Sequence, residues 1–388
     1  MFLSNKDRED YSAKQSSNAF TLIRNEIGEE YAETHNKPWI IGYSGGKDST
    51  LVVHLVVEHL ISLPRSERKR TVHVLANDTL VESPLVLEHL RTVLDEIARA
   101  ARAFELPIVV ATTAPKPDQT FWVNLIGRGY PSPNRNFRWC TDRMKIRPTS
   151  NYIRNQACVS GEVILLLGVR RNESATRARS VARYDNGGRL NRHNDLQDCF
   201  VFRPILELSA DDVWEFLGEN EPPWGGSHNQ LIRLYREAAG GECPVVMSTS
   251  DVPSCGTSSS RFGCWTCTVV EKDKSLAGFV ESGFNQFLPL LEFRDWIIEI
   301  RNDPERRLAR RRNGRVTITK NGNFVPGPFN IATRHEILDR LLELQEKTRM
   351  VLIRDSEIER IRELWVEDAI LSAERNDQMH LIETEEYN

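Results

Sequence analysis

The chain has 388 residues, 40% of them hydrophobic and 27% charged, and its formal net charge is −4. This is the composition of a soluble globular protein with room for two domains or one enlarged α/β domain. It contains no run of about 18 apolar residues that would predict a transmembrane helix, and no signal-peptide core. Its seven cysteines are an odd number, which favours reduced thiols or metal ligands over disulfides. We therefore expect a cytoplasmic protein that does not enter a membrane.

The first half of the chain alternates expected helices with expected strands. Apolar residues at three- and four-residue steps predict an amphipathic helix over residues 13–34. The expected strands cover residues 39–43, 71–76, 108–111 and 163–168, and the expected helices cover residues 51–57, 84–104 and 145–156. This alternation predicts an α/β fold with a parallel sheet and right-handed crossovers. Ligands of such sheets lie at the carboxyl ends of the strands.

The remaining segments differ in composition. Residues 113–133 are rich in Pro, Gly and polar residues and are expected to form an active-site loop. Residues 195–207 include another short strand, and Ser209 is expected to cap a helix over residues 213–217. We expect an α/β domain over residues 1–220, a cysteine-rich module over residues 221–280, and a mostly helical C-terminal region over residues 281–388 with a hairpin insert near Val316.

The turn after the first strand has the composition of an anion-binding site. Two adjacent glycines let the backbone approach an anion closely. The residues after them favour a helix start, where free N–H groups attract phosphate, and a lysine adds positive charge. The order differs from the Walker A spacing. A nucleotide site is predicted here, and the alternative is a glycine-rich turn without a ligand. The residues concerned are Ser44, Gly45, Gly46, Lys47, Asp48 and Ser49.

Basic residues gather in the middle of the chain, where 13 Lys or Arg stand against 4 Asp or Glu between Arg135 and Arg192. Such density beside a nucleotide site suggests a polyanionic substrate. A planar guanidinium grips phosphate through two bonds, although an internal ion pair with Glu173 would also explain the arginines after residue 168. A second basic cluster, from Arg306 to Arg315, fits a solvated face equally well. The phosphate-binding candidates are Arg138, Arg143, Lys145, Arg147, Arg170, Arg171 and Arg177.

Four cysteines crowd one stretch with the pattern C-x11-C-x8-C-x2-C, namely Cys243, Cys255, Cys264 and Cys267. A C-x2-C pair places two thiolates on one tight turn, and two more from flanking loops can complete a tetrahedral set. The spacing leaves an iron–sulfur cluster, zinc and free thiols open. Cys140 lies among basic residues, so it is either a reactive thiolate or a buried structural residue.

Several motifs together resemble a known family. Ser44–Ser49, Arg138-Trp139-Cys140-Thr141, Gly168–Ser174 with Arg177, and Pro204-Ile205 followed by Asp212-Val213-Trp214 occur in this order. They resemble the phosphoadenylyl-sulfate reductase superfamily of adenine-nucleotide α hydrolases, whose turn after the first strand is the pyrophosphate loop of the ATP pyrophosphatases. The cysteine stretch over residues 241–268 is similar to that of DNA phosphorothioation proteins of the DndC/SspD type. The resemblance covers roughly residues 14–280.

The resemblance implies an ATP pyrophosphatase that exchanges a non-bridging oxygen of the DNA backbone for sulfur. It implies ATP and Mg²⁺ as ligands and a [4Fe-4S] cluster on Cys243, Cys255, Cys264 and Cys267. Its expected partners are DNA, a cysteine desulfurase and an ATPase or nickase subunit. The residues expected at the nucleotide are Ser44, Gly45, Gly46, Lys47, Asp48, Ser49, Asn77, Asp78, Thr79, Gly168, Arg170 and Arg177, with Lys47, Asp48, Arg170 and Arg171 as the catalytic set.

Three other functions compete with this interpretation. A phosphoadenylyl or adenylyl-sulfate reductase needs a nucleophilic cysteine near its C-terminus, and no cysteine follows Cys267 in this sequence. A tRNA thiolase shares the pyrophosphate loop, but the Arg-Trp-Cys-Thr and Gly-Val-Arg-Arg elements are not its usual signature. A non-catalytic DNA-binding subunit would use ATP only as a switch and would release no pyrophosphate.

Overall fold

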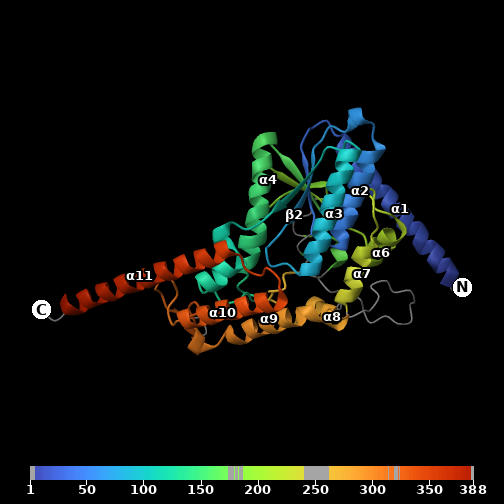
Figure 1. Cartoon of the computed structure of the whole chain (residues 1–388). Helices are drawn as coiled ribbons and strands as arrows, with labels where there is room; N and C mark the ends of the chain where they lie inside the picture. Colours follow the sequence, from blue (N-terminus) through green and yellow to red (C-terminus); the bar gives the residue numbers. More distant parts are fainter. Residues whose placement is uncertain are drawn as a thin grey trace. The chain divides into compact units, whose positions relative to one another are not determined.

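The computed structural model describes residues 5–173, 179, 182, 187–239, 262–312, 314–318, 322 and 324–385 (Figure 1). It forms two compact units that interleave along the chain. The first consists of Met1–Asp78, Ser83–Thr113 and Thr149–Phe262, and the second of Thr79–Glu82, Ala114–Pro148 and Gly263–Asn388. Arg177, Cys243 and Cys255, which the sequence singles out, lie outside the described residues.

The first unit is built on a six-stranded sheet with the order β3-β2-β1-β4-β6-β5. All neighbours pair in parallel except β5 and β6, so the predicted parallel sheet is confirmed and gains one antiparallel edge strand. Gly42 at the end of β1 lies opposite Leu75 of β2 and Leu167 of β4, which brings three carboxyl ends to one edge. The strands are β1 Trp39–Gly42, β2 Val72–Asn77, β3 Ile108–Thr113, β4 Val163–Leu167, β5 Leu190–Arg192 and β6 Cys199–Phe202.

Helices cover both faces of this sheet. Figure 1 shows α4 on one face and α2 and α3 on the other. The helices are α1 Asn5–Ala32, α2 Lys47–Ser62, α3 Pro84–Ala103, α4 Arg147–Ser160, α6 Ala210–Glu219 and α7 Asn229–Ala238. Ser209 caps α6 in a capping box with Asp212, as the sequence predicts.

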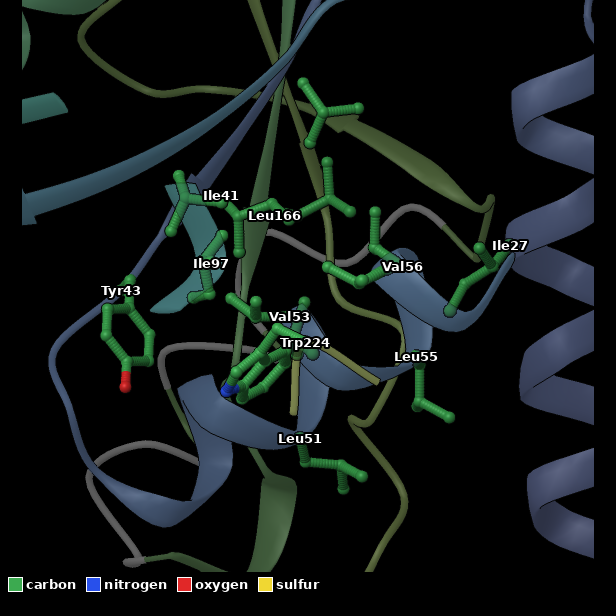
Figure 2. Close-up of a cluster of buried hydrophobic side chains, with 14 of the residues drawn as sticks. Ile27, Ile41, Tyr43, Leu51, Val53, Leu55, Val56, Ile97, Leu166 and Trp224 are labelled. Atoms are coloured by element: carbon green, nitrogen blue, oxygen red, sulfur yellow. The ribbon is translucent and has the colours of Figure 1, made fainter. Parts of the chain in front are cut away.

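Successive strand residues point to opposite faces of the sheet, and each face has its own core. Ile41 and Leu166 pack with Val53 and Val56 of α2 and with Ile27 of α1 in the larger cluster (Figure 2). The alternate residues, among them Ile40 and Leu165, pack with Ile153 and Ala157 of α4. The apolar stripe predicted for α1 is buried at Phe20, Ile23, Ile27 and Tyr31.

The second unit is mostly helical. Its α-helices are α8 Lys274–Glu281, α9 Leu288–Ile300, α10 Ile331–Thr348 and α11 Asp355–Glu385, and β7 Thr317–Ile318 pairs with β8 Phe324–Val325 in the predicted hairpin. Two π-helical turns, η3 Val123–Gly127 and η4 Thr141–Ile146, belong to the same unit. Short 3₁₀ turns occur in both units. Those of the second unit are η2 Pro117–Gln119, η6 Asn285–Phe287 and η7 Pro304–Arg306, and those of the first are η1 Arg65–Glu67 and η5 Arg171–Glu173. None of the helices in the described ranges is long and apolar enough to cross a membrane.

The expectation of a loop without elements over residues 113–133 is wrong, because η2 and η3 form there; an active-site role for the segment stays a prediction. Phe121, Trp122 and Ile126 are buried, and the Trp122 indole Nε1 donates to the Leu352 carbonyl at 2.7 Å. A Cβ on Gly127 would come within 2.8 Å of Leu364 Cδ1, so this glycine permits close packing on α11. The prediction failed because Pro and Gly on both sides concealed a short run of apolar residues that forms part of the second unit's core.

Candidate functional site

The loop after β1 and the first turn of α2, residues 43–50, are together called the phosphate turn below. Gly45 has φ +74, and a Cβ there would lie 3.3 Å from Leu90 Cδ1, so both backbone conformation and packing favour glycine. Ser49 Oγ donates to the Gly46 carbonyl at 2.9 Å and accepts from the Ser44 amide at 3.2 Å. These bonds fix the turn without occupying its glycine amides.

Helix α2 begins at the phosphate turn without a capping side chain from its own N-cap residue. Gly46 is the N-cap residue and makes no side-chain cap bond. The amide of Lys47 points at the Tyr235 hydroxyl, 3.4 Å away, and the Lys47 ammonium lies 5.9 Å from the centre of the Tyr235 ring. Free N–H groups and the helix dipole at such an end attract a phosphate group. Tyr235 comes from α7, and no sequence motif indicated it.

Asp48 joins the phosphate turn to the turn after β4. Its Oδ1 accepts from Arg170 Nε at 2.6 Å, and its Oδ2 accepts from Lys47 Nζ at 2.9 Å. A Cβ on Gly168 would lie 2.7 Å from the carbonyl carbon and oxygen of Asp48, so only glycine allows the two turns to meet. An internal ion pair of these arginines exists between Arg170 and Asp48, and the Glu173 side chain considered from the sequence lies outside the described part of the structure.

The two adjacent arginines after β4 have different surroundings. Arg170 is buried, with a relative exposure of 4%, whereas Arg171 is partly exposed and pairs with Glu207 at 2.7 Å. The phosphate turn, Gly168 and Arg170 therefore form one constellation. The Arg171 side chain is engaged by Glu207 instead.

The three residues expected near the ribose or metal divide between the two units. At the end of β2, the Thr113 hydroxyl donates to Asn77 Oδ1 at 3.0 Å, and the mostly exposed Arg91 pairs with Asp78 at 3.3 Å. Thr79 belongs to the second unit, where its hydroxyl donates to Glu82 at 2.8 Å and lies 3.2 Å from Cys264 Sγ.

The C-x2-C pair forms a second constellation, called the cysteine turn below and consisting of residues 264–268. The Cys267 amide donates to the Cys264 carbonyl at 3.0 Å, which closes the turn. The amide of Trp265 donates to the Val81 carbonyl at 3.1 Å, and its ring packs against Trp122 and Phe293. Both cysteines are free thiols on one preformed turn.

Polar and charged groups surround Cys264. Lys145 Nζ lies 3.4 Å from Glu82 Oε1, and Glu82 Oε1 is 3.7 Å from Cys264 Sγ. Burial and, next, the Glu82 carboxylate raise the pKa of the Cys264 thiol. A proton must therefore leave this sulfur before it can bind a metal, and the Lys145 ammonium is the nearby cation that favours the thiolate.

A buried arginine that the sequence did not indicate donates to the backbone of the cysteine turn. Arg294 of α9 is 1% exposed, and its Nε donates to the Cys267 carbonyl at 2.9 Å. Its other nitrogens donate to the Glu271 and Val270 carbonyls and to the Asp295 carboxylate. The sequence carries no motif for such a clamp, since most of its acceptors are backbone carbonyls.

Cys140 also belongs to the second unit. Burial, helped by the neighbouring Cys267 thiol, raises the pKa of Cys140, which disfavours the reactive thiolate considered from the sequence. No group of three metal-binding side chains is already assembled in the part of the chain that the structure describes. Cys140, Cys264 and Cys267 are nevertheless soft sulfur donors in one unit, and they suit an iron–sulfur cluster or zinc.

The predicted phosphate-binding residues from 138 to 147 all lie in the second unit. Arg138 is exposed. Arg143 donates to Asn124 and to the Tyr130 hydroxyl, each at 3.2 Å, and to Gln119. Lys145 pairs with Glu82, and Arg147 pairs with Asp142 at 2.7 Å. Three of the four thus have partners within the chain, although Arg138, Lys145 and Arg147 are all exposed.

Comparison with known proteins gives a family-level match. The model of the phosphoadenosine phosphosulfate reductase domain matches residues 38–270. An uncharacterized protein of Methanocaldococcus jannaschii is 24% identical over 207 residues, which cover 53% of this chain and 36% of that protein. The chain thus spans little more than a third of the length of the curated relative that it matches.

Solved structures resemble the chain only distantly. Phosphoadenylyl-sulfate reductase from Candida auris is 12% identical, with 57% of this chain and 88% of that chain covered and a TM-score of 0.34. The U34-tRNA thiolase NcsA from Methanococcus maripaludis, solved with its [4Fe-4S] cluster, is 10% identical, with 73% and 80% covered and a TM-score of 0.33.

Proposed function

The chain belongs to the phosphoadenosine phosphosulfate reductase domain family, and we propose that it is an ATP pyrophosphatase that activates the DNA backbone for sulfur insertion. The observation that carries the proposal is the constellation of Lys47, Asp48 and Arg170 at the open N-terminus of α2. Positive charge and free amides gathered at one point suit the pyrophosphate that leaves when ATP is cleaved at its α phosphorus.

In the proposed reaction, a phosphate oxygen of DNA attacks the α phosphorus of ATP and pyrophosphate leaves. The amides of the phosphate turn hold the β and γ phosphates, and Lys47 neutralises the departing charge. A sulfur nucleophile then attacks the activated DNA phosphorus and AMP leaves with the oxygen. Adenylation is needed because an unactivated phosphate oxygen is a poor leaving group.

Asp48 fits the role of an anchor in this site. Both of its carboxylate oxygens already accept from cations, so it positions Lys47 and Arg170 before the nucleotide arrives. Mg²⁺ prefers carboxylate and phosphate oxygens, and we assign it to the nucleotide phosphates with Asp78 as the candidate protein ligand. Arg171 and Arg177 are proposed to act on the incoming DNA phosphate.

We propose that a cluster is held by Cys243, Cys255, Cys264 and Cys267, with Cys140 as the competing fourth ligand. The preformed cysteine turn supports Cys264 and Cys267 as ligands, and the position of Cys140 beside Cys267 makes Cys140 the competitor. When bound, an iron–sulfur cluster supplies one-electron transfer. Replacing Cys264 or Cys267 by serine should abolish the visible absorbance and iron content of anaerobically purified protein, whereas the exposed Cys158→Ser should change neither.

Comparison of Cys140→Ser with Cys243→Ser decides the fourth ligand. Whichever substitution lowers the iron content as far as Cys264→Ser identifies it, and a wild type that is colourless and contains zinc would refute the cluster. The partners of the activity are proposed to be a cysteine desulfurase as sulfur source and an ATPase or nickase subunit.

The decisive test of the function is the stoichiometric release of AMP and pyrophosphate from MgATP in the presence of duplex DNA. Lys47→Ala should lower the rate about 10²- to 10³-fold, the usual cost of losing one group that stabilises developing charge. Arg99→Ala, an exposed change on α3, should leave it unchanged. Deleting the gene should remove phosphorothioate linkages from genomic DNA, and loss of thiolated tRNA bases instead would identify a tRNA thiolase.

A further inference from the structure

The segment from residue 306 to residue 329 contains the β7–β8 hairpin and is called the arginine hairpin below. It carries six arginines and one lysine and no acidic residue, in a chain whose net charge is −4. The proposed nucleotide and cluster sites use none of these residues. The structure separates the arginines that hold the hairpin in place from those that face solvent.

Three arginines anchor the base of the hairpin. The Arg307 guanidinium donates to the carbonyls of Gly327 at 2.6 Å, Arg301 at 2.6 Å and Pro326 at 3.1 Å. Arg306 pairs with Glu336 of α10, and Arg312 pairs with Asp368 of α11 at 2.6 Å. The positive charges of Arg306 and Arg312 are thus matched by carboxylates of the same unit.

The backbone at the base is equally well held. The Leu308 amide donates to the Pro328 carbonyl at 2.8 Å, and Gly327 approaches so closely that a Cβ on it would lie 2.0 Å from the Arg310 carbonyl oxygen. Further along the hairpin, β7 and β8 pair as antiparallel strands. In the part of the hairpin that the structure describes, the base is therefore held to the second unit by both side-chain and backbone contacts.

The outer part of the hairpin combines exposed arginines with exposed apolar side chains. Arg310, Arg311 and Arg315 are exposed, and Arg310 Nη1 donates to the Gly314 carbonyl at 3.2 Å. Among these charges, Leu308 is 44% exposed, Val316 49%, Ile318 63% and Phe324 50%. Together with the exposed arginines, these apolar side chains support a binding role for this part of the surface.

We propose that the arginine hairpin is a docking surface for double-stranded DNA, which rests on the proposed function of the chain. Guanidinium groups form two-bond contacts with phosphates, and no acidic residue occurs from residue 306 to residue 330, so the segment itself adds no charge that repels a polyanion. The apolar side chains supply contacts with sugars and base edges that proteins use in the grooves of DNA. Charge complementarity therefore selects the occupant.

The test measures binding of a fluorescein-labelled 20-base-pair duplex to the full chain by fluorescence anisotropy over a range of salt concentrations. The Arg310→Ala/Arg311→Ala double variant should bind about tenfold more weakly at low salt. The slope of log Kd against log salt should fall by about 2, roughly one for each lost phosphate contact. Arg99→Ala/Arg102→Ala removes the same charge from exposed positions on α3 and should match the wild type.

Phe324→Ala separates the apolar contribution from the ionic one. It should weaken binding by a few fold and leave the salt slope unchanged, because it removes no phosphate contact. The circular dichroism spectrum of each variant should match that of the wild type, since the altered side chains are exposed.

Two outcomes would overturn the proposal. One is a double variant that binds the duplex with the Kd and salt slope of the wild type. If the wild type then still releases pyrophosphate with DNA, the hairpin proposal fails and the proposed function stands. The other is an arginine-dependent preference for tRNA over duplex DNA. Arginine-dependent DNA binding without pyrophosphate release would keep the hairpin proposal and refute the proposed function.

Discussion

The phosphate turn of the first unit and the cysteine turn of the second are each held by a buried arginine, but the two arginines meet different partners. Arg170 donates to the carboxylate of Asp48, which lies 122 residues earlier in the chain. Arg294 donates mainly to backbone carbonyls of the segment that contains Cys267. The first arrangement links two motifs through charge, and the second fixes the shape of one loop.

This difference has a consequence for ligand binding. At the phosphate turn, Asp48 holds two cations side by side, so their charge is available to an anion without having to be gathered first. At the cysteine turn, Arg294 donates mainly to carbonyl oxygens, whereas the Cys264 sulfur lies beside Thr79 and Glu82. One site is arranged for an anion, whereas at the other burial and the Glu82 carboxylate raise the pKa of the Cys264 thiol.

The largest expected effect tests whether Arg170 anchors the phosphate turn, by comparing its replacement with that of the neighbouring Arg171. Arg170→Ala should lower the free energy of unfolding by about 3–5 kcal/mol, because it removes one partner of an ion pair whose side chains are 5% and 19% exposed. Arg171→Ala breaks a pair whose side chains are 35% and 71% exposed and should cost about 0–1 kcal/mol. Urea denaturation measures both.

Equal costs for the two variants would show that Arg170 does not anchor the phosphate turn. If Arg170→Ala fails to fold, Arg170→Lys provides the same test, since a lysine keeps the charge but loses the directed Nε contact with Asp48. Its cost should fall between those of the two alanine variants.

The sequence predicted the phosphate turn well because its signals are local. A short β-rich run, two glycines and a helix-starting sequence follow one another directly, and the structure has β1, Gly45 in the left-handed region and α2 at those positions. The parallel sheet was predictable for the same reason. The edge strand β5 was not, because three residues carry too little periodicity.

The surroundings of the cysteine turn could not be predicted in this way. Arg294 binds mostly backbone carbonyls, which every residue possesses, so no side-chain pattern marks its partners. Thr79 was expected near the ribose or metal because it follows Asp78, yet its hydroxyl lies beside Cys264. No local pattern at residues 77–79 indicated this contact with a cysteine 185 residues later, and a role for Thr79 at the nucleotide stays a prediction.

Replacing Arg294 by methionine tests the clamp on the cysteine turn. Several buried carbonyls would lose a charged donor, and we expect a cost of about 2–4 kcal/mol in unfolding free energy. Arg340→Ala, which removes a guanidinium lying 4.1 Å over the Trp296 ring, should cost about 0.5–1 kcal/mol. Hydrogen exchange at the Trp265 amide should accelerate only in Arg294→Met.

Unchanged exchange at Trp265 in Arg294→Met would show that the cysteine turn is held by its own backbone bonds. The pair of variants separates a local loosening from a general loss of stability, because Arg340 and Arg294 belong to the same unit.

The smallest expected effect concerns Gly168, where the turn after β4 meets the phosphate turn. Gly168→Ala should cost about 1–3 kcal/mol, since the new Cβ would lie 2.7 Å from backbone atoms of Asp48 and one of the turns must shift. Gly218→Ala, in α6 with nothing within 4 Å of its Cβ, should instead stabilise the chain by about 0.4–1 kcal/mol. Thermal unfolding measures both, and pyrophosphate release should fall only in Gly168→Ala, because displacing Asp48 separates Lys47 from Arg170.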